Sequence, residues 1–385
     1  MQEQIDYVKQ KGVIAQGPKK VLVVGASTGY GLSSRVVAAF GCQAQTMGVF
    51  FEKSANGVRT ASAGWYNSAA FEQKARKDGL YAKSFNGDAY SDDMKDQVVS
   101  AIKKDWGNVD LVIYSLASPR RQHPRTGQIA KSALKPVGRE YTNKSIDLTK
   151  DQLEMVTLPV ATSQEIEETV SVMGGEDWEF WMDALQKEGL LKKGAMTVAY
   201  SYIGPELTRA VYRNGTIGKA KDHLEATAKR LDERLKKIDG RALISINKAL
   251  VTQSSSAIPF IPLYFILLSK VMKEKNIDEG CIQQMDRLFR EFLFRPDGKI
   301  SVDNNGFVRL DDREMRVDVQ QKVAEQWEKL NRANLKDLAD LEGYHRDFLK
   351  LFGFGLQGVD YDADVELAQN PLSLSANSRV VESRE

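Results

Sequence analysis

Histidine and cysteine are scarce in this chain of 385 residues, which contains three histidines and two cysteines. Cys42 and Cys281 cannot build a disulfide framework or a cysteine-rich zinc site. The histidines lie far apart in the sequence, and none has the spacing of a metal-ligand pair. We therefore expect no metal centre. If the protein is an enzyme, we expect its acid or base to be a residue other than histidine.

Excess charge of one sign and long apolar runs are also lacking. Lysine and arginine number 54 against 52 acidic residues, and this balance excludes a strongly basic nucleic-acid binder. The longest apolar run, 257–268, is broken by Pro259 and Pro262 and is shorter than the roughly 20 residues of a spanning helix. The polar start has no signal-peptide pattern. We predict no nucleic-acid partner, no membrane span and a cytoplasmic location.

Short apolar runs alternate with helical segments in the first 115 residues. Such runs are typical of parallel strands that are covered on both faces. The predicted strands are 20–24, 46–51, 81–85 and 109–115, and the predicted helices between them are 32–40, 69–78 and 92–106. This alternation indicates an α/β fold, a Rossmann-type doubly wound parallel sheet.

The remainder of the chain elaborates this sheet. Residues 119–162 are polar and are interpreted as an inserted loop or hairpin. Further strands are predicted at 195–200 and 243–246, and further helices at 162–172, 177–188 and 219–237. We take 19–275 as a dinucleotide-binding core and 276–385 as a helical C-terminal extension with a hairpin of strands 299–302 and 307–310. No linker is evident, so residues 1–385 are predicted to form a single elaborated domain.

A glycine-rich turn follows the first predicted strand. It reads Gly25, Ala26, Ser27, Thr28, Gly29, Tyr30, Gly31. Glycines let the backbone approach a pyrophosphate, and the following helix points its positive N-terminus at that anion. The strand before the turn and the helix after it favour nucleotide binding over a purely structural turn.

Further candidate cofactor contacts follow the other strands of this half. Glu52 stands about 20 residues after the last glycine, where a carboxylate would accept a hydrogen bond from a ribose 2′-hydroxyl and repel a 2′-phosphate. The pattern favours NADH over NADPH, and the alternative is an exposed Glu52–Lys53 pair. Asp88 with Ala89, and Leu116 with Ala117, follow the next two strands and face the same crevice unless they are ordinary loop residues.

A tyrosine and a lysine offer proton chemistry without histidine. The glycine spacing is that of short-chain dehydrogenases, whose catalytic Tyr and Lys share one helix face, four residues apart. Here Tyr212 and Lys221 are nine apart, and on an unbroken helix they would lie on opposite faces. They can converge if Asn214-Gly215 and Gly218 break the helix, and a nearby ammonium would then lower the tyrosine pKa. The alternative is a chance spacing.

At these residues the sequence resembles a known family, the enoyl-acyl carrier protein reductases of the FabV type and the closely related trans-2-enoyl-CoA reductases. The matching stretches run in order through nearly the whole chain. They include 25–32 (GASTGYGL), 49–53 (VFFEK), 134–136 (LKP), 199–206 (AYSYIGPE), 215–218 (GTIG) and 247–253 (NKALVTQ).

The resemblance implies NADH-dependent reduction of the trans-2 double bond of enoyl thioesters, with Tyr212 as proton donor, Lys221 on the cofactor and Tyr202 on the thioester. It implies that NADH is bound by residues 25–30, Phe51, Glu52, Asp88, Ala89, Leu116, Ala117, Lys221, Leu250, Val251 and Thr252. The implied partners are an enoyl thioester and an acidic acyl carrier protein that docks transiently. We expect a monomer.

Alternatives to this interpretation remain open from the sequence. They are a reductase acting mainly on short-chain CoA esters, a ketoacyl reductase or alcohol dehydrogenase, and a non-catalytic sensor of NAD(H). A basic cluster after the fourth strand, comprising Arg120, Arg121, His123 and Arg125, could steer an acidic carrier protein or could be an ordinary solvated face.

Overall fold

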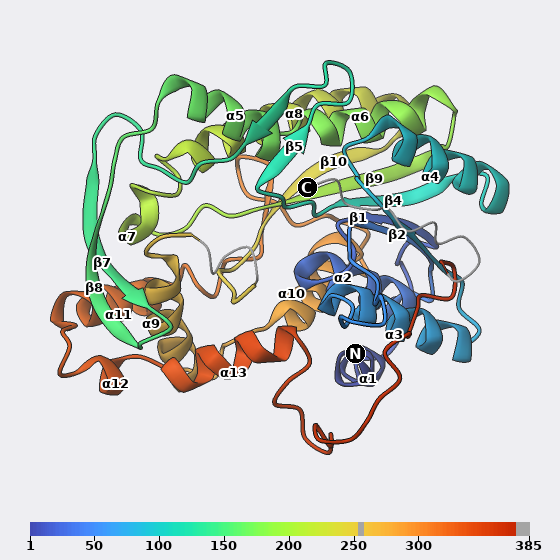
Figure 1. Cartoon of the computed structure of the whole chain (residues 1–385). Helices are drawn as coiled ribbons and strands as arrows, with labels where there is room; N and C mark the ends of the chain where they lie inside the picture. The colour runs from blue at the N-terminus through green and yellow to red at the C-terminus, as the bar shows by residue number, and fades with distance from the viewer. Residues whose placement is uncertain (253–257, 375–385) are drawn as a thin grey trace.

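A seven-stranded parallel sheet organises the computed structural model, which describes residues 1–252 and 258–374 (Figure 1). Its strands are β1 (Lys20–Val24), β2 (Gln45–Phe50), β3 (Ala82–Asn86), β4 (Val109–Tyr114), β9 (Leu191–Ser201), β10 (Arg241–Ile246) and β11 (Phe307–Arg309). The spatial order is β3-β2-β1-β4-β9-β10-β11, and every neighbouring pair is parallel. The predicted Rossmann-type doubly wound sheet is confirmed.

Alternate residues of the central strands face two helical layers. Val21 and Val23 contribute to one apolar cluster, whereas Leu22 and Val24 contribute to the other. The first layer contains α1 (Gln2–Gln10), α2 (Gly29–Val36) with its π-helical continuation Val37–Gly41, α3 (Ala63–Lys77) and α10 (Cys281–Arg287) with its π-helical continuation Leu288–Leu293. The second layer contains α4 (Asp92–Asp105), α6 (Glu176–Lys187) and α8 (Thr216–Leu235).

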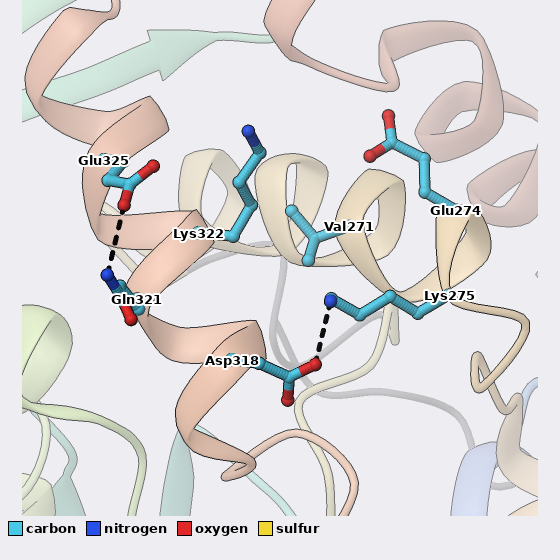
Figure 2. A pocket seen from close by; sticks show the side chains of 7 residues that line it. All are labelled: Val271, Glu274, Lys275, Asp318, Gln321, Lys322 and Glu325. Carbon is cyan, nitrogen blue, oxygen red and sulfur yellow. Dashed lines mark hydrogen bonds and ion pairs between the residues drawn. The ribbon is translucent and has the colours of Figure 1, made fainter.

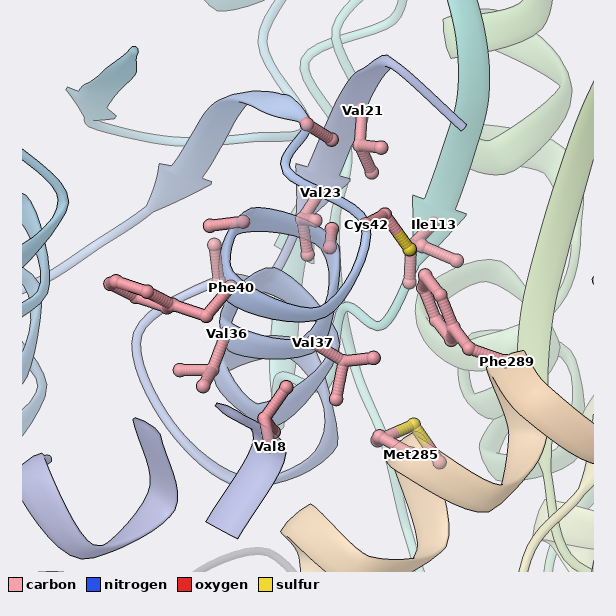
Figure 3. Packing of buried hydrophobic residues seen from close by; sticks show 14 of the residues in the cluster. Val8, Val21, Val23, Val36, Val37, Phe40, Cys42, Ile113, Met285 and Phe289 are labelled. Atoms are coloured by element: carbon pink, nitrogen blue, oxygen red, sulfur yellow. The ribbon is translucent and has the colours of Figure 1, made fainter. Parts of the chain in front are cut away.

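The first layer joins parts of the chain that are far apart in sequence. Met285 and Phe289, from α10 and its continuation, are fully buried in the same cluster as Val37 and Ile113 (Figure 3). The core of the nucleotide-binding half therefore includes residues beyond 275, where the sequence interpretation ends it.

The hairpin predicted in the C-terminal extension is not formed, and this prediction is wrong. Turns do form at Gly298 and Gly306, which have positive φ angles. However, Phe307–Arg309 pairs in parallel with β10, and residues 299–302 are not a strand. The reason is that the edge of the main sheet offers unpaired backbone groups and a neighbouring core to the apolar segment, whereas an isolated four-residue partner strand offers only its own backbone.

The insertion forms two hairpins rather than one. The first pairs β5 (Arg120–Gln122) with β6 (Ile129–Lys131), and the second pairs β7 (Tyr141–Asp147) with β8 (Gln152–Leu158). The longer hairpin is an arm that reaches from α5 (Ser163–Met173) toward α9 (Ile261–Glu274) and α11 (Val317–Lys329) (Figure 1). At its far part, the Lys144 ammonium donates hydrogen bonds to the carbonyls of Trp327 (2.7 Å) and Leu330 (2.9 Å).

A third apolar cluster surrounds α9 (Ile261–Glu274), most of whose residues are buried. It also takes side chains from α11 (Val317–Lys329), α12 (Leu335–Leu338), α13 (Leu341–Leu351) and the arm, and it includes Tyr212. The remaining helices are short: α7 (Glu206–Arg209) and the 3₁₀ turn Lys236–Ile238. In the described part of the chain, no helix combines the length and apolarity needed to cross a membrane.

Local capping explains where two of the helices begin, and tertiary packing explains a third. Thr162 and Glu165 form the predicted capping box, in which each side chain bonds to the other residue's backbone N–H. Ser91 caps α4 by accepting from the Met94 N–H at 3.1 Å. Helix α3 begins at Ala63, six residues before the predicted start, because Gly64, Trp65 and the residues that follow pack against the glycine turn and the first apolar cluster.

Candidate functional site

The glycine turn is shaped to admit a phosphate group. Gly25 has φ +89°, and a Cβ there would lie 2.4 Å from the Ser115 carbonyl oxygen. A Cβ on Gly31 would lie 1.8 Å from the Gly25 carbonyl oxygen, so neither position accepts a side chain. The N-cap residue Thr28 makes no side-chain bond to α2, which leaves the first N–H groups of that helix for an anion. This cradle fits the pyrophosphate of NADH.

Glu52 is fixed beside the glycine turn. It accepts hydrogen bonds from the Ser27 hydroxyl (2.7 Å) and the Ser62 hydroxyl (2.5 Å), and its backbone pairs with the Asn86 side chain. The alternative of an exposed Glu52–Lys53 pair is not what the structure shows, because Glu52 is partly buried and bonded to the turn itself. Each carboxylate oxygen keeps a lone pair for a ribose hydroxyl.

The other predicted cofactor residues also follow carboxyl ends of strands, which lie along one edge of the parallel sheet. Phe51, at the end of β2, is 71% exposed. Asp88 follows β3 and is exposed, whereas Ala89 is buried and its carbonyl accepts from Trp181 Nε1 at 3.2 Å. Leu116 and Ala117 follow β4, whose next residue, Ser115, closes over Gly25.

The segment after β10 meets the glycine turn directly. The Tyr30 hydroxyl donates to the Lys248 carbonyl at 2.7 Å. A Cβ on Gly29 would lie 3.9 Å from the Thr252 methyl carbon, so Leu250, Val251 and Thr252 belong to the same edge of the sheet as residues 25–30. Gln253, the last residue of the 247–253 stretch, lies outside the described residues.

The chain between Tyr212 and Lys221 is broken, as predicted. Tyr212 lies in a turn after α7, and α8 begins at Thr216. Gly218 does not make the break, contrary to expectation, because it lies inside α8. A Cβ on Gly218 would lie 1.8 Å from the Arg213 carbonyl oxygen, so its role is to let the turn pack against the helix. Asn214-Gly215 alone therefore separates the two segments.

The insertion holds the start of α8 in place. Thr216 is fully buried, and its hydroxyl donates to the Ala133 carbonyl. Its N–H donates to the Lys135 carbonyl at 3.0 Å, and Pro136 bridges to Gly215. These contacts come from Ala133 and the adjoining 134–136 stretch, which together fix the helix that carries Lys221 relative to the turn that carries Tyr212.

Tyr212 and Lys221 occupy an environment that disfavours charge. Burial raises the pKa of Tyr212, and negative charge on Glu314 raises it further, so the expected lowering by Lys221 is wrong. Burial also lowers the pKa of Lys221 to about 8. The Tyr212 hydroxyl and the Lys221 ammonium have no hydrogen-bond partner among residues 1–252 and 258–374. A protonated phenol with a free hydroxyl suits a proton donor at neutral pH.

Tyr202 lies against Tyr212, as the predicted site requires. Their ring centroids are 4.8 Å apart with an interplanar angle of 83°. The Tyr202 hydroxyl donates to Glu314 Oε1 at 2.8 Å. Sequence reasoning missed Glu314, which comes from the loop after β11, 102 positions beyond Tyr212. No motif marks it, because its role arises only from the parallel pairing of β10 and β11.

A hollow of about 400 Å³ between α9 and α11 is a different feature (Figure 2). It is lined by Val271, Glu274, Lys275, Asp318, Gln321, Lys322 and Glu325. Two of its charged residues, Lys275 and Asp318, form an ion pair of 2.8 Å. Tyr264 lies in the first turn of α9 and Lys275 follows the last, which puts them roughly 16 Å apart along the helix axis. We assign this hollow no part in the site.

The predicted basic cluster is smaller than its sequence suggests. The Arg121 side chain is fully buried and pairs with Glu176 at 2.7 Å, so it is not a surface charge. His123 contacts the same carboxylate at 3.3 Å. Arg120 and Arg125 are exposed. In the part of the chain that the structure describes, no group of three or more His, Cys, Asp or Glu side chains could hold a metal ion.

Comparison with protein families finds three consecutive matches. Residues 1–57 match the NAD(P)H binding domain of trans-2-enoyl-CoA reductase, and residues 59–294 match the trans-2-enoyl-CoA reductase catalytic region. Residues 302–365 match a family described as enoyl reductase FAD binding domain. The one strand there, β11, leads into Leu310 and Asp311 rather than a glycine turn, so these residues do not fit a second dinucleotide cradle. We assign no step to a flavin.

Curated relatives cover almost the whole chain. The chain is 58% identical to the enoyl-[acyl-carrier-protein] reductase [NADH] of Coxiella burnetii, over 95% of this chain and 90% of that protein. It is 54% identical to the trans-2-enoyl-CoA reductase [NADH] of Ruminiclostridium cellulolyticum, over 95% of this chain and 92% of that protein.

Solved structures of trans-2-enoyl-CoA reductases also match almost the whole chain. The trans-2-enoyl-CoA reductase of Clostridium acetobutulicum, in complex with NADH, matches with a TM-score of 0.93 and 45% identity over 96% of this chain and 93% of that one. The Treponema denticola trans-2-enoyl-CoA reductase, in complex with NAD, matches with a TM-score of 0.91 and 48% identity, over 96% and 92%. A short-chain dehydrogenase from Burkholderia cenocepacia, 16% identical, shares the fold at a TM-score of 0.50 over 77% of this chain and 96% of that one.

Replacement of Glu52 by alanine should relax the choice of nicotinamide cofactor. The carboxylate that would repel a 2′-phosphate is removed, so the ratio of NADH affinity to NADPH affinity, measured by fluorescence titration, should fall by about tenfold or more. Lys53→Ala, which changes the exposed neighbour, is the control and should leave this ratio nearly unchanged. An unchanged ratio in Glu52→Ala would remove Glu52 from cofactor selection.

Proposed function

The chain belongs to the trans-2-enoyl-CoA reductase family, whose members include NADH-dependent enoyl-acyl carrier protein reductases, and we propose that Tyr212, Lys221 and Tyr202 carry its reaction. The protein is an NADH-dependent oxidoreductase that reduces the trans-2 double bond of enoyl thioesters. The observation that carries the residue assignment is the edge-to-face contact of Tyr202 with Tyr212, which brings two phenols together after β9 and before α8.

The proposed cofactor site is the cradle at the carboxyl edge of the sheet. Residues 25–30 would bind the pyrophosphate, and Glu52 the adenosine ribose. Phe51, Asp88, Ala89, Leu116, Ala117 and residues 250–252 would line the remaining contacts. When bound, NADH supplies the hydride that reduces the β-carbon of the substrate. Lys221 would contribute its ammonium to the nicotinamide ribose, and its pKa near 8 leaves that charge present at neutral pH.

The proposed task of Tyr212 is to stabilise the negative charge that develops on the thioester oxygen. Reduction at the β-carbon turns the thioester into an enolate, and a hydrogen bond aimed at the enolate oxygen stabilises it more than it stabilises the substrate. Burial keeps Tyr212 protonated, so its hydroxyl can donate. Protonation at the α-carbon then gives the saturated acyl thioester.

Tyr212→Phe should lower kcat strongly and leave the KM of the enoyl thioester nearly unchanged. The ring still fills its place against Tyr202, and only the donor to the enolate is lost, so kcat should fall by about 100-fold or more. NADH oxidation with crotonyl-CoA measures this. Tyr361→Phe, at a half-exposed tyrosine of the C-terminal loop, is the control. Turnover by Tyr212→Phe at the wild-type rate would remove Tyr212 from the mechanism.

We propose that the acyl group is presented on either acyl carrier protein or CoA, since relatives of this chain carry names of both kinds. Docking of an acidic carrier protein would rest on Arg120 and Arg125, because Arg121 and His123 share Glu176. We also propose that the protein acts as a monomer in the cytoplasm.

A charge-reversing double variant, Arg120→Glu with Arg125→Glu, should weaken the reaction with carrier-protein substrates and not the reaction with CoA substrates. It should raise the KM for an enoyl-carrier protein several-fold and leave the KM for the enoyl-CoA of the same chain length unchanged. Added salt should weaken the wild-type preference, because the screening length falls to about 8 Å at physiological ionic strength. Equal effects on both carriers, or none on either, would contradict docking at this patch.

A further inference from the structure

Glu314 is a buried carboxyl group that none of the roles above uses. Its side chain is fully buried, and no lysine, arginine or histidine forms an ion pair with it among the described residues. Its Oε1 accepts hydrogen bonds from Tyr202 (2.8 Å) and Tyr264 (2.7 Å), and its Oε2 accepts from the Ala249 N–H (2.7 Å). The carboxyl therefore connects the substrate tyrosine, α9 and the segment after β10.

A buried carboxyl without a cation is costly in stability, so packing alone does not explain it. Apolar residues of similar volume are often equal or better at such places. Burial raises the pKa of Glu314, and the three hydrogen bonds oppose that rise. Lys248, whose charge lowers the pKa of Glu314, forms its ion pair with Asp278 at 3.0 Å instead. The ionisation state of Glu314 is therefore set chiefly by burial, which favours the protonated form, against three hydrogen bonds that favour the carboxylate.

The hydrogen-bond direction at Tyr202 decides what this tyrosine can do. A phenol has one hydrogen, and while Glu314 is ionised that hydrogen is given to Oε1. Tyr202 then presents only lone pairs, which repel an enolate oxygen. If Glu314 carries the proton, its own O–H can donate to the Tyr202 oxygen, and the Tyr202 hydrogen becomes free for the substrate.

We propose that Glu314 is a positioning residue that sets the hydrogen-bond polarity of Tyr202, and that its protonated form turns the Tyr202 hydroxyl toward the thioester oxygen. The inference rests on the proposed contact of Tyr202 with that oxygen. No proton is consumed at Glu314: the carboxyl keeps its proton through the turnover and gives only a hydrogen bond.

The groups that face Glu314 come from every element packed against it. They are Tyr202 after β9, Tyr212 before α8, Tyr264 on α9, Lys248 and Ala249 after β10, Tyr30 on α2 and Gln320 on α11. Burial raises the pKa of all four tyrosines, so they stay neutral through the working pH range. Because these phenols stay neutral, the ionisation of Glu314 is the change that would reorient Tyr202.

The test is a double-mutant cycle between Glu314→Gln and Tyr202→Phe, read as kcat/KM for crotonyl-CoA across pH. Gln keeps an oxygen for Ala249 and offers an N–H to Tyr202 at every pH. In the wild type, kcat/KM should fall as Glu314 ionises. This decline should be absent in Glu314→Gln. Tyr202→Phe should cost about tenfold, the effect of one hydrogen bond to a charged oxygen, and adding Glu314→Gln should cost nothing more.

Tyr264→Phe is the matched variant, because it removes the second donor to the same oxygen and leaves Tyr202 intact. Loss of a donor to the carboxylate raises the Glu314 pKa, so the decline in kcat/KM should move to higher pH. The NADH Kd should be unchanged in all three variants. Independent, additive losses in the cycle, or a Glu314→Gln profile identical to that of the wild type, would overturn the inference. If Tyr202→Phe reduced crotonyl-CoA as fast as the wild type, Tyr202 would instead be removed from the site.

Discussion

The hydrogen bonds between Thr216 and residues 133–135 determine where Lys221, the proposed catalytic lysine, is placed. A Tyr and a Lys nine residues apart cannot share a helix face, so the chain must be turned between them. The turn at Asn214-Gly215 makes this possible, and the insertion fixes it, since Thr216 bonds to residues 133 and 135 through both its hydroxyl and its N–H. A segment that resembles a surface insertion in the sequence is thus a structural part of the site.

The second determinant is the return of the chain to the sheet after α9. Strand β11 pairs with β10, and the loop that follows brings Glu314 under Tyr202 and against Ala249. Arg313, its neighbour, pairs with Glu279 at 2.9 Å, and Glu279 in turn holds Arg287 of α10. The same loop therefore connects Tyr202, the proposed substrate contact, to the helix layer that contains α10.

The residues that follow strands could be predicted, and those that depend on tertiary pairing could not. Gly25 and Glu52 could be placed because a buried apolar strand precedes each of them, and Asp88 because it follows the mixed strand β3. All three follow strands whose carboxyl ends lie at one edge of the sheet. The break at Gly215 followed from the spacing argument. The raised pKa of Tyr212, the burial of Arg121 and the role of Glu314 depend on which side chains meet across more than 50 residues of sequence, and no local pattern records this.

The hairpin prediction failed for a related reason. Turn residues at 296–298 and 305–306 do mark turns, but turn chemistry does not state which strand will pair with the next apolar segment. An apolar segment pairs more favourably with the unpaired edge of a large parallel sheet than with a short isolated strand. In this chain the turn residues therefore predict local backbone geometry but do not predict which strands pair.

In the proposed reaction NADH would supply hydride to the β-carbon, Tyr202 and Tyr212 would hydrogen-bond the enolate oxygen, and the α-carbon would take its proton from solvent. Reduction of crotonyl-CoA with unlabelled NADH in D₂O tests this most directly, with the butyryl product analysed by NMR. We predict one deuterium at the α-carbon and none at the β-carbon. Deuterium at the β-carbon, or a hydroxyacyl product in place of the saturated thioester, would contradict the account.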